Sequence, residues 1–191
     1  MWVHAGVTSE RDDVLDTLLG PGARVRSGGP ERPGGIVVGG IGLPWLRDLD
    51  FGTQWINRHI DEVWGDGVVL EDLSYAAHRV MHRLQELVPD RVILIGAMPR
   101  DVDAPGTVRH YQLDLTPPPD AEVHERLTEA VGGIIDLDHT LAVCRWGRVF
   151  PVDTVIIEVE PADRAFGLGF SDPVEAVVGD VTALVRAELG R

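Results

Sequence analysis

Apolar and polar residues follow two recurring patterns along most of the chain. Short apolar or alternating runs predict strands at 36–39, 68–71, 91–95, 107–113 and 154–160. In the intervening segments, apolar residues recur every three or four positions, which predicts helices at 53–64, 76–87, 123–131, 140–146 and 173–189. Strands that alternate with helices are typical of βαβ units. We therefore expect an α/β fold, namely a three-layer α/β/α sandwich with a mostly parallel sheet, like those of phosphorylases and hydrolases.

The first 35 residues have a different composition. Thr8 and Ser9 followed by Glu10 predict the start of a short helix, because such residues cap helix N-termini, and Gly20-Pro21-Gly22 predicts its end. Residues 27–35 are rich in glycine and proline, which is typical of a loop or linker. We expect residues 1–35 to be an N-terminal extension and linker, and residues 36–191 to form one domain.

Composition narrows the classes of partner. The net charge of −14 argues against nucleic acid, whose phosphates require clustered lysine and arginine. No apolar run reaches the roughly 20 residues that span a bilayer, so we expect no membrane insertion. Cys144 is the only cysteine, which excludes an internal disulfide, and we expect a cytoplasmic location. The composition leaves the oligomeric state open.

The main candidate binding and catalytic residues follow the first predicted strand. Gly40 and Gly42 interrupt the apolar run, and Asp48 and Asp50 precede the next predicted helix. Open α/β folds place binding sites where parallel strands end, so the two glycines are candidate binding residues. Trp45 is either an exposed anchor for a partner or a packed loop residue. Asp48 and Asp50 are either catalytic candidates or caps of the following helix.

Several separated motifs follow the order and spacing of one known family. From about residue 36 to residue 189, the chain resembles the hydrogenase maturation proteases. These endopeptidases trim the C-terminus of the [NiFe]-hydrogenase large subunit after nickel insertion. The motifs that carry the resemblance are Gly40-Ile41-Gly42 with Asp48 and Gly52, then Asp72, Pro105-Gly106-Thr107, and residues 169–174.

The resemblance implies a peptidase-like hydrolase that acts in hydrogenase maturation. We expect it to be an aspartic-type endopeptidase with Asp48 and Asp50 as catalytic candidates. The resemblance also implies that Gly40, Gly42 and Asp72 contribute to binding, together with Trp45. The implied partner is the [NiFe]-hydrogenase large subunit.

The resemblance further implies a metal site, but its three ligand positions fall at Leu49, at Gly96 and near Gly132 or Gly133. None of these side chains can bind a metal, because metal sites in proteins need nitrogen, oxygen or sulfur donors. We therefore expect no cofactor of the chain itself, although nickel could arrive with the substrate. The candidate substitute ligands are Asp50, Asp138, His139 and Glu160.

The substitute ligands also have purely structural interpretations. Asp138 is expected to cap the helix that follows it, although a carboxylate beside His139 could also make that imidazole a base. Glu158 and Glu160 share one face of the last predicted strand. They could bind a cation or do acid–base work, or they form a solvated strand end.

Two functions therefore remain open. The first is a non-catalytic or atypical hydrogenase maturation protease-like protein that binds the large subunit. The second is an active endopeptidase that cleaves the C-terminal extension of the large subunit with substrate nickel or an altered metal site. The missing donors favour the first hypothesis, because apolar side chains cannot replace metal ligands.

Overall fold

The computed structural model describes residues 34–131 and 135–191. The helix and most of the linker expected within the first 35 residues lie outside the described residues, as do Gly132 and Gly133. In the described part of the chain, no helix is long and apolar enough to cross a membrane.

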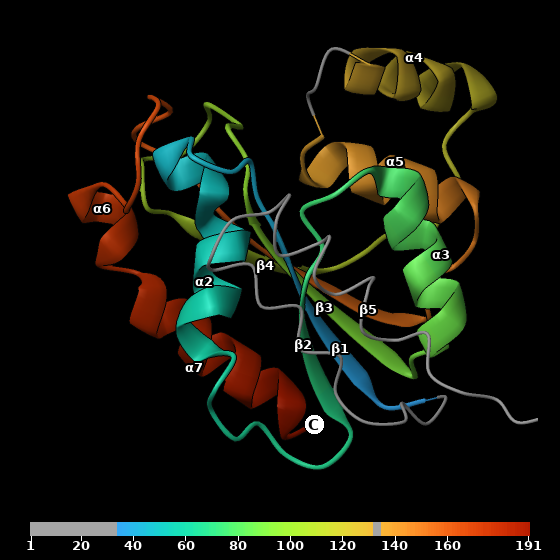
Figure 1. The fold of residues 1–191 in the computed structure, drawn as a ribbon, viewed down its shortest axis with the longest axis horizontal. Helices are drawn as coiled ribbons and strands as arrows, with labels where there is room; N and C mark the ends of the chain where they lie inside the picture. The colour runs from blue at the N-terminus through green and yellow to red at the C-terminus, as the bar shows by residue number, and fades with distance from the viewer. Residues whose placement is uncertain (1–33, 132–134) are drawn as a thin grey trace, which may run out of the picture. The chain divides into compact units, whose positions relative to one another are not determined.

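The described residues form a five-stranded sheet in the order β2-β1-β3-β5-β4 (Figure 1). Strands β2, β1, β3 and β5 run parallel, whereas β4 pairs with β5 in the antiparallel direction at the sheet edge. The expected α/β fold with a mostly parallel sheet is thus confirmed. The strands are β1 (Ile36–Ile41), β2 (Val68–Asp72), β3 (Arg91–Ala97), β4 (Val108–Gln112) and β5 (Asp153–Val159).

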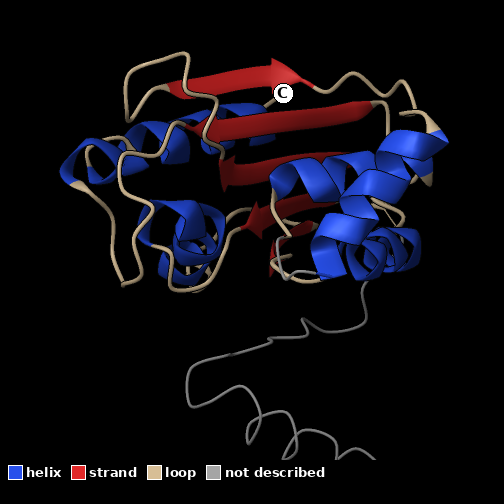
Figure 2. Ribbon diagram, turned by 90° about the horizontal axis from the view of Figure 1, so that it is seen from above, coloured by secondary structure: helices blue, strands red, loops and turns tan. Residues whose placement is uncertain are grey.

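Helices cover both faces of the sheet (Figure 2). Apolar side chains of α2 and α7 pack on one face, and those of α3 and α5 pack on the other. Helix α4 packs against α3 and α5 through Val123. Because β3 is buried on both faces, its sequence is an almost continuous apolar run. The helices are η1 (Arg47–Asp50), α2 (Phe51–His59), α3 (Ala77–Leu87), α4 (Asp120–Val131), α5 (Leu137–Trp146), α6 (Asp172–Glu175) and α7 (Val178–Leu189).

Two glycines allow the first turn of α2 to lie directly on β1. A Cβ atom at Gly40 would approach the Gly52 carbonyl oxygen to 2.2 Å, and one at Gly52 would approach the Ile41 nitrogen to 2.2 Å. Both distances are far below van der Waals contact, so neither position accepts a side chain without a shift of the backbone. This close packing places the Gly40–Gly52 loop at the carboxyl end of β1.

Two expected helices differ from the structure. The helix expected at 53–64 ends at His59, because the chain folds back and the Trp64 indole N–H donates to the His59 carbonyl over 3.0 Å. The closing helix expected at 173–189 is divided into α6 and α7. The break lies at Val177, whose φ of −101° and ψ of 1° leave the helical region.

Candidate functional site

Asp48 joins two loops at the carboxyl end of the sheet. Its buried carboxylate accepts hydrogen bonds from the backbone N–H groups of Ala162, Asp163 and Ser171 and from the Ser171 hydroxyl, at 2.7–2.9 Å. Burial alone would raise the pKa of Asp48, but the hydrogen bonds from Ser171 and the two backbone groups hold it below the ordinary value. A carboxylate held by so many donors is a structural anchor. The expectation that Asp48 caps the following helix is wrong, because these donors come from a distant loop.

Asp50 lies two residues further along and has a different environment. It occupies the N-cap position of α2, but its side chain makes no capping hydrogen bond, so the expected cap is wrong here as well. Its Oδ1 atom is buried without a hydrogen-bond partner among the described residues, and Oδ2 lies 3.3 Å from the Gln54 amide. Burial raises the pKa of Asp50 to about 6, although the nearby Thr53 and Gln54 side chains lower it. Asp50 is therefore a carboxyl group that changes charge close to neutral pH.

The glycine loop and the end of β2 meet as the sequence predicts. Gly40 pairs with Asp72 in the sheet, and the Gly42 N–H donates to the Ser74 hydroxyl over 2.9 Å. The Ser74 hydroxyl also lies 2.5 Å from that of Thr53, at the start of α2. Asp72 is exposed and accepts a hydrogen bond from the Ser74 N–H. This edge therefore brings together Gly40, Gly42 and Asp72, three of the expected binding residues.

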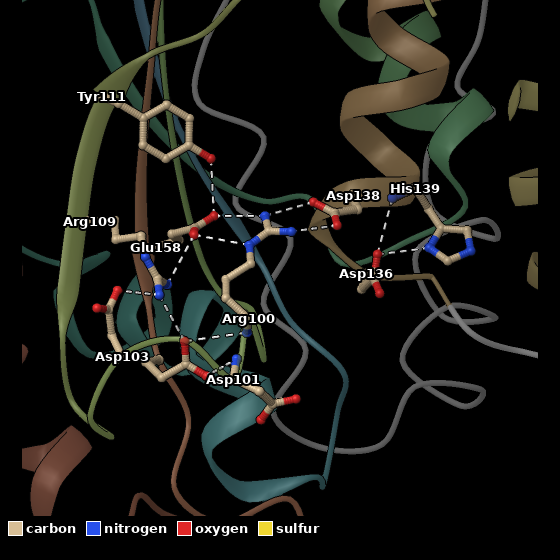
Figure 3. Close-up of polar contacts among 10 residues, drawn as sticks. Arg100, Asp101, Asp103, Arg109, Tyr111, Asp136, Asp138, His139 and Glu158 are labelled. Carbon is tan, nitrogen blue, oxygen red and sulfur yellow. Dashed lines mark hydrogen bonds and ion pairs between the residues drawn. The ribbon is translucent and has the colours of Figure 1, made fainter. Parts of the chain in front are cut away.

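A network of charged side chains occupies the carboxyl end of β3, β5 and the neighbouring part of β4 (Figure 3). At its centre, the Arg100 guanidinium holds two carboxylates, each through two hydrogen bonds. Its contacts with Asp138 measure 2.8 and 2.9 Å, and those with Glu158 measure 3.1 and 2.9 Å. Paired contacts of this kind are the strongest that arginine makes with carboxylates. Arg100 thereby ties the loop after β3 to β5 and to the start of α5.

Arg109 on β4 completes the network. It binds Glu158 at 3.3 Å and Glu160 at 3.0 Å, and it also pairs with Asp103. The Glu160 carboxylate further accepts hydrogen bonds from the backbone N–H groups of Arg100 and Asp101. Glu158 and Glu160 are each only 2% exposed, so the expected solvated strand end is wrong. Both carboxylates are buried because arginines on the neighbouring segments neutralise them.

The charges in the network are stable near neutral pH. Burial alone would raise the pKa of Glu158, but the hydrogen bonds from Arg100 hold it below the ordinary value. Burial and the charge of Glu158 raise the pKa of Tyr111 to about 12, and Tyr111 donates to Glu158 over 3.0 Å. General acid–base catalysis works best with a group that titrates near the working pH. The network is therefore suited to holding its segments together and to binding charged groups.

A pocket of about 350 Å³ opens beside the network. Its wall includes Arg100, Tyr111 and Asp138, together with charged residues of α4 and α5. The mixture of acidic and basic side chains on this wall suits a polar, charged surface group better than an apolar ligand.

His139 lies apart from the network and faces the other way in Figure 3. Its ring Nδ1 is 2.7 Å from Asp136, and the ring is buried. Asp136, and not Asp138, caps α5 by accepting the His139 backbone N–H. The expected cap at Asp138 is therefore wrong, because that carboxylate is committed to Arg100.

The described residues do not fit the metal site implied by the resemblance. Leu49 is half-buried, and a side chain at Gly96 would meet the Ile41 carbonyl oxygen at 3.1 Å. Among the described residues, no three histidine, cysteine or acidic side chains gather in a way that could hold a metal ion. The substitute candidates are already engaged elsewhere or lie apart. Asp138 and Glu160 bind arginine or backbone groups, whereas Asp50 and His139 lie outside the network.

Trp45 is exposed rather than packed in its loop, with 61% of its surface accessible. Its φ of +64° lies in the left-handed region, which is uncommon for a residue with a large side chain. Trp45 therefore stays available as a binding residue, but it lies on a loop separate from the charged network.

The most connected residues of the network were not among the expected site residues. The sequence pattern does not indicate a site role for Arg100, Arg109 or Tyr111, because a lone arginine in a loop or an edge strand is usually solvated. One signal was available, since Arg109 and Tyr111 alternate along β4 as Glu158 and Glu160 do along β5. That signal needs the antiparallel register, in which Arg109 pairs with Glu158, before it points to a contact.

No protein-family model matches this sequence, and no curated protein matches it. Solved structures do match. They include an endopeptidase from Escherichia coli (22% identity, TM-score 0.64, 81% of this chain and 91% of that chain). They also include the hydrogenase maturating endopeptidase HybD from E. coli (21% identity, TM-score 0.62, 81% of this chain and 91% of that chain). A third is a hydrogenase 2 maturation peptidase from Thaumarchaeota archaeon SCGC_AB-539-E09 (20% identity, TM-score 0.59, 82% of this chain and 98% of that chain).

These similarities establish the fold. The resemblance to hydrogenase maturation proteases that the motifs indicated is confirmed at that level. The expected class of aspartic-type endopeptidase is wrong, since the similar structures are hydrogenase maturation proteases and not aspartic-type endopeptidases. The local geometry agrees, because an aspartic pair must share a proton between two carboxylates. Asp48 is held ionised by its donors, whereas Asp50 contacts Gln54.

Proposed function

We propose that this chain acts in [NiFe]-hydrogenase maturation as a non-catalytic relative of the maturation proteases, and that it binds the hydrogenase large subunit. The observation that carries the proposal is the Arg100 guanidinium between Asp138 and Glu158, at the end of the sheet where open α/β proteins place their sites. The positive charge among the carboxylates of this edge is therefore supplied by a side chain of the protein, Arg100.

The electrostatics of the network support this proposal. A metal ion that approached Glu158 would have to displace two guanidinium groups and the Tyr111 hydroxyl. Breaking a buried ion pair costs about 3–5 kcal/mol, because one charge stays buried without its partner. The network therefore holds the shape of this edge without metal, as a binding protein requires.

An active endopeptidase remains the second candidate, and Asp50 is the observation that favours it. A carboxyl group with a pKa of about 6 and an unpaired buried oxygen has the properties of a general base. Its burial argues against this role, since Asp50 is only 5% exposed and a substrate would have little access to it.

A binding and cleavage assay distinguishes the two candidates. The purified chain is mixed with the nickel-loaded large-subunit precursor from the same organism; complex formation is followed by calorimetry, and the precursor C-terminus by mass spectrometry. We expect a complex in which the precursor keeps its full mass. Release of a C-terminal peptide by the wild-type chain, but not by Asp50→Asn, would establish the endopeptidase instead.

Metal content gives an independent measurement. After incubation with nickel or zinc and gel filtration, we expect far less than one metal ion per chain by elemental analysis. Stoichiometric metal that disappears in Asp48→Ala or Asp50→Ala would contradict the proposal. Arg126→Ala is the control, since Glu129 on the surface of α4 is the only ion-pair partner of Arg126 among the described residues.

A further inference from the structure

Three large apolar side chains are exposed on two neighbouring loops at the carboxyl end of the sheet. Trp45 is 61% exposed, Phe166 is 82% exposed and Leu168 is 73% exposed. Single exposed apolar residues are common in proteins, but a group of large ones marks an interaction surface. We name these three residues the Trp45 platform.

Backbone contacts join the two segments that carry these three residues. The Gly167 N–H donates to the Trp45 carbonyl over 2.7 Å, and the Arg47 N–H donates to the Gly167 carbonyl over 3.2 Å. Phe166 and Leu168 flank Gly167 in the sequence, and Trp45 precedes the bridge between Leu46 and Gly167. The three side chains therefore belong to adjacent backbone segments that are far apart in the sequence.

The structure holds the platform in a fixed shape. The Asp48 carboxylate binds both ends of the loop that carries Phe166, at Asp163 and at Ser171. Trp45 and Arg47 both adopt positive φ angles, of 64° and 44°. Such strained conformations persist only where the surroundings impose them, and they concentrate at functional sites. Pre-organised apolar groups lose little entropy when they bind a partner.

The charge around the platform indicates the chemistry of its partner. Arg47 pairs with Asp163 at 2.9 Å, and Arg164 pairs with Asp101, so both cations of these loops are neutralised. Exposed Asp172 has no ion pair with any described residue, and the whole chain carries a net charge of −14. A second copy of the chain would be repelled. A partner segment with apolar side chains flanked by lysine or arginine would be attracted.

We propose that the Trp45 platform is the surface on which the chain docks an apolar, positively flanked segment of the hydrogenase large subunit. This inference rests on the function proposed above, and it identifies the residues that make the contact. The ion pair between Arg164 and Asp101 links the platform loop to the loop that carries Arg100. A docked subunit would therefore lie close to Asp101, in the loop that carries Arg100.

Calorimetric titration of the purified large-subunit precursor tests the inference. Phe166→Ser and the double variant Trp45→Ser/Leu168→Ser are compared with the wild-type chain. We expect each to weaken binding by about tenfold or more, because truncation of central aromatic and aliphatic anchors has effects of that size. Val63→Ser and Val152→Ser are matched controls, since these residues are 89% and 86% exposed outside the platform. The controls should change the affinity by less than about twofold.

Each outcome separates the inference from the proposed function. If the wild-type chain binds the precursor and the platform variants bind equally well, the inference fails while the proposed function stands. If the wild-type chain does not bind the precursor at all, the proposed function fails and the inference fails with it. Sedimentation of the chain alone tests whether a second copy of the chain occupies the platform instead. If the wild-type chain forms a dimer and Phe166→Ser dissociates it, the platform serves self-association and the inference is overturned. Thermal unfolding confirms that every variant is folded.

Discussion

Asp48 and Asp50 are two residues apart, yet the structure predicts that their substitution by asparagine has opposite effects on stability. The pKa of Asp50 is raised from 3.8 to about 6, mainly because the carboxyl group is buried. At about 1.36 kcal/mol per pKa unit, this shift corresponds to about 3 kcal/mol. Because the folded protein binds the proton more tightly than the unfolded chain, ionised Asp50 opposes folding above about pH 6. The penalty fades as the pH falls through 6 towards 4.

Asp50→Asn removes this penalty, because an amide does not ionise. We expect the free energy of unfolding to rise by about 2–3 kcal/mol near pH 8. It should change by only about 0.5 kcal/mol near pH 4, where the folded carboxyl is protonated and the unfolded one is about half protonated. With a urea m-value of about 2 kcal/mol/M, the unfolding midpoint should shift upward by about 1 M at the higher pH. Urea titrations of the variant and the wild-type chain, followed by tryptophan fluorescence at both pH values, measure the difference.

Asp48→Asn is the matched control with the opposite sign. The lowered pKa of Asp48 reflects hydrogen bonds to its ionised form, and an amide would turn its NH₂ group towards some of those donors. We expect a loss of about 2–4 kcal/mol near pH 8, and this loss should shrink as acid protonates the wild-type carboxyl. The reasoning is refuted if Asp50→Asn destabilises the protein near pH 8, or if its effect is the same at both pH values.

Two further predictions concern the network and the packing of the glycine loop. Arg100→Met should lower the free energy of unfolding by about 3–5 kcal/mol near pH 7, because buried Glu158 loses its main partner. The surface control Arg126→Met should change it by less than about 0.5 kcal/mol, and equal effects in urea titrations would show that the network contributes nothing. Gly52→Ala should destabilise the protein by about 3 kcal/mol or more, since its Cβ would lie 2.2 Å from the Ile41 nitrogen. Gly179→Ala in α7 meets open space and should stabilise it by up to about 1 kcal/mol, and similar thermal unfolding of the two variants would contradict the packing argument.

Some site features were predictable from short stretches of sequence. The spacing of glycines and acids after β1 indicated a loop at the carboxyl end of the sheet, and Gly40, Gly42 and Asp72 do meet there. The different hydrogen-bonding environments of Asp48 and Asp50 were not predictable, because both residues suit a helix start equally well in sequence. Asp48 finds its donors in residues 162–171, more than 110 positions away. Asp50 finds no comparable donors, and this difference alone separates an anchor from a titratable group.

Local patterns in the amino-acid sequence are enough to predict the succession of strands and helices along the chain and a mostly parallel sheet, because burial of a strand or helix face leaves a local periodicity. The antiparallel pairing of β4 with β5, which brings Arg109 and Tyr111 to Glu158, is visible only in the folded chain. The fold likewise brings Arg100 to both Asp138 and Glu158, and the Trp45 carbonyl to the Gly167 N–H. These contacts depend on long-range register and on which charges are desolvated together, and neither leaves a periodic signal in the sequence.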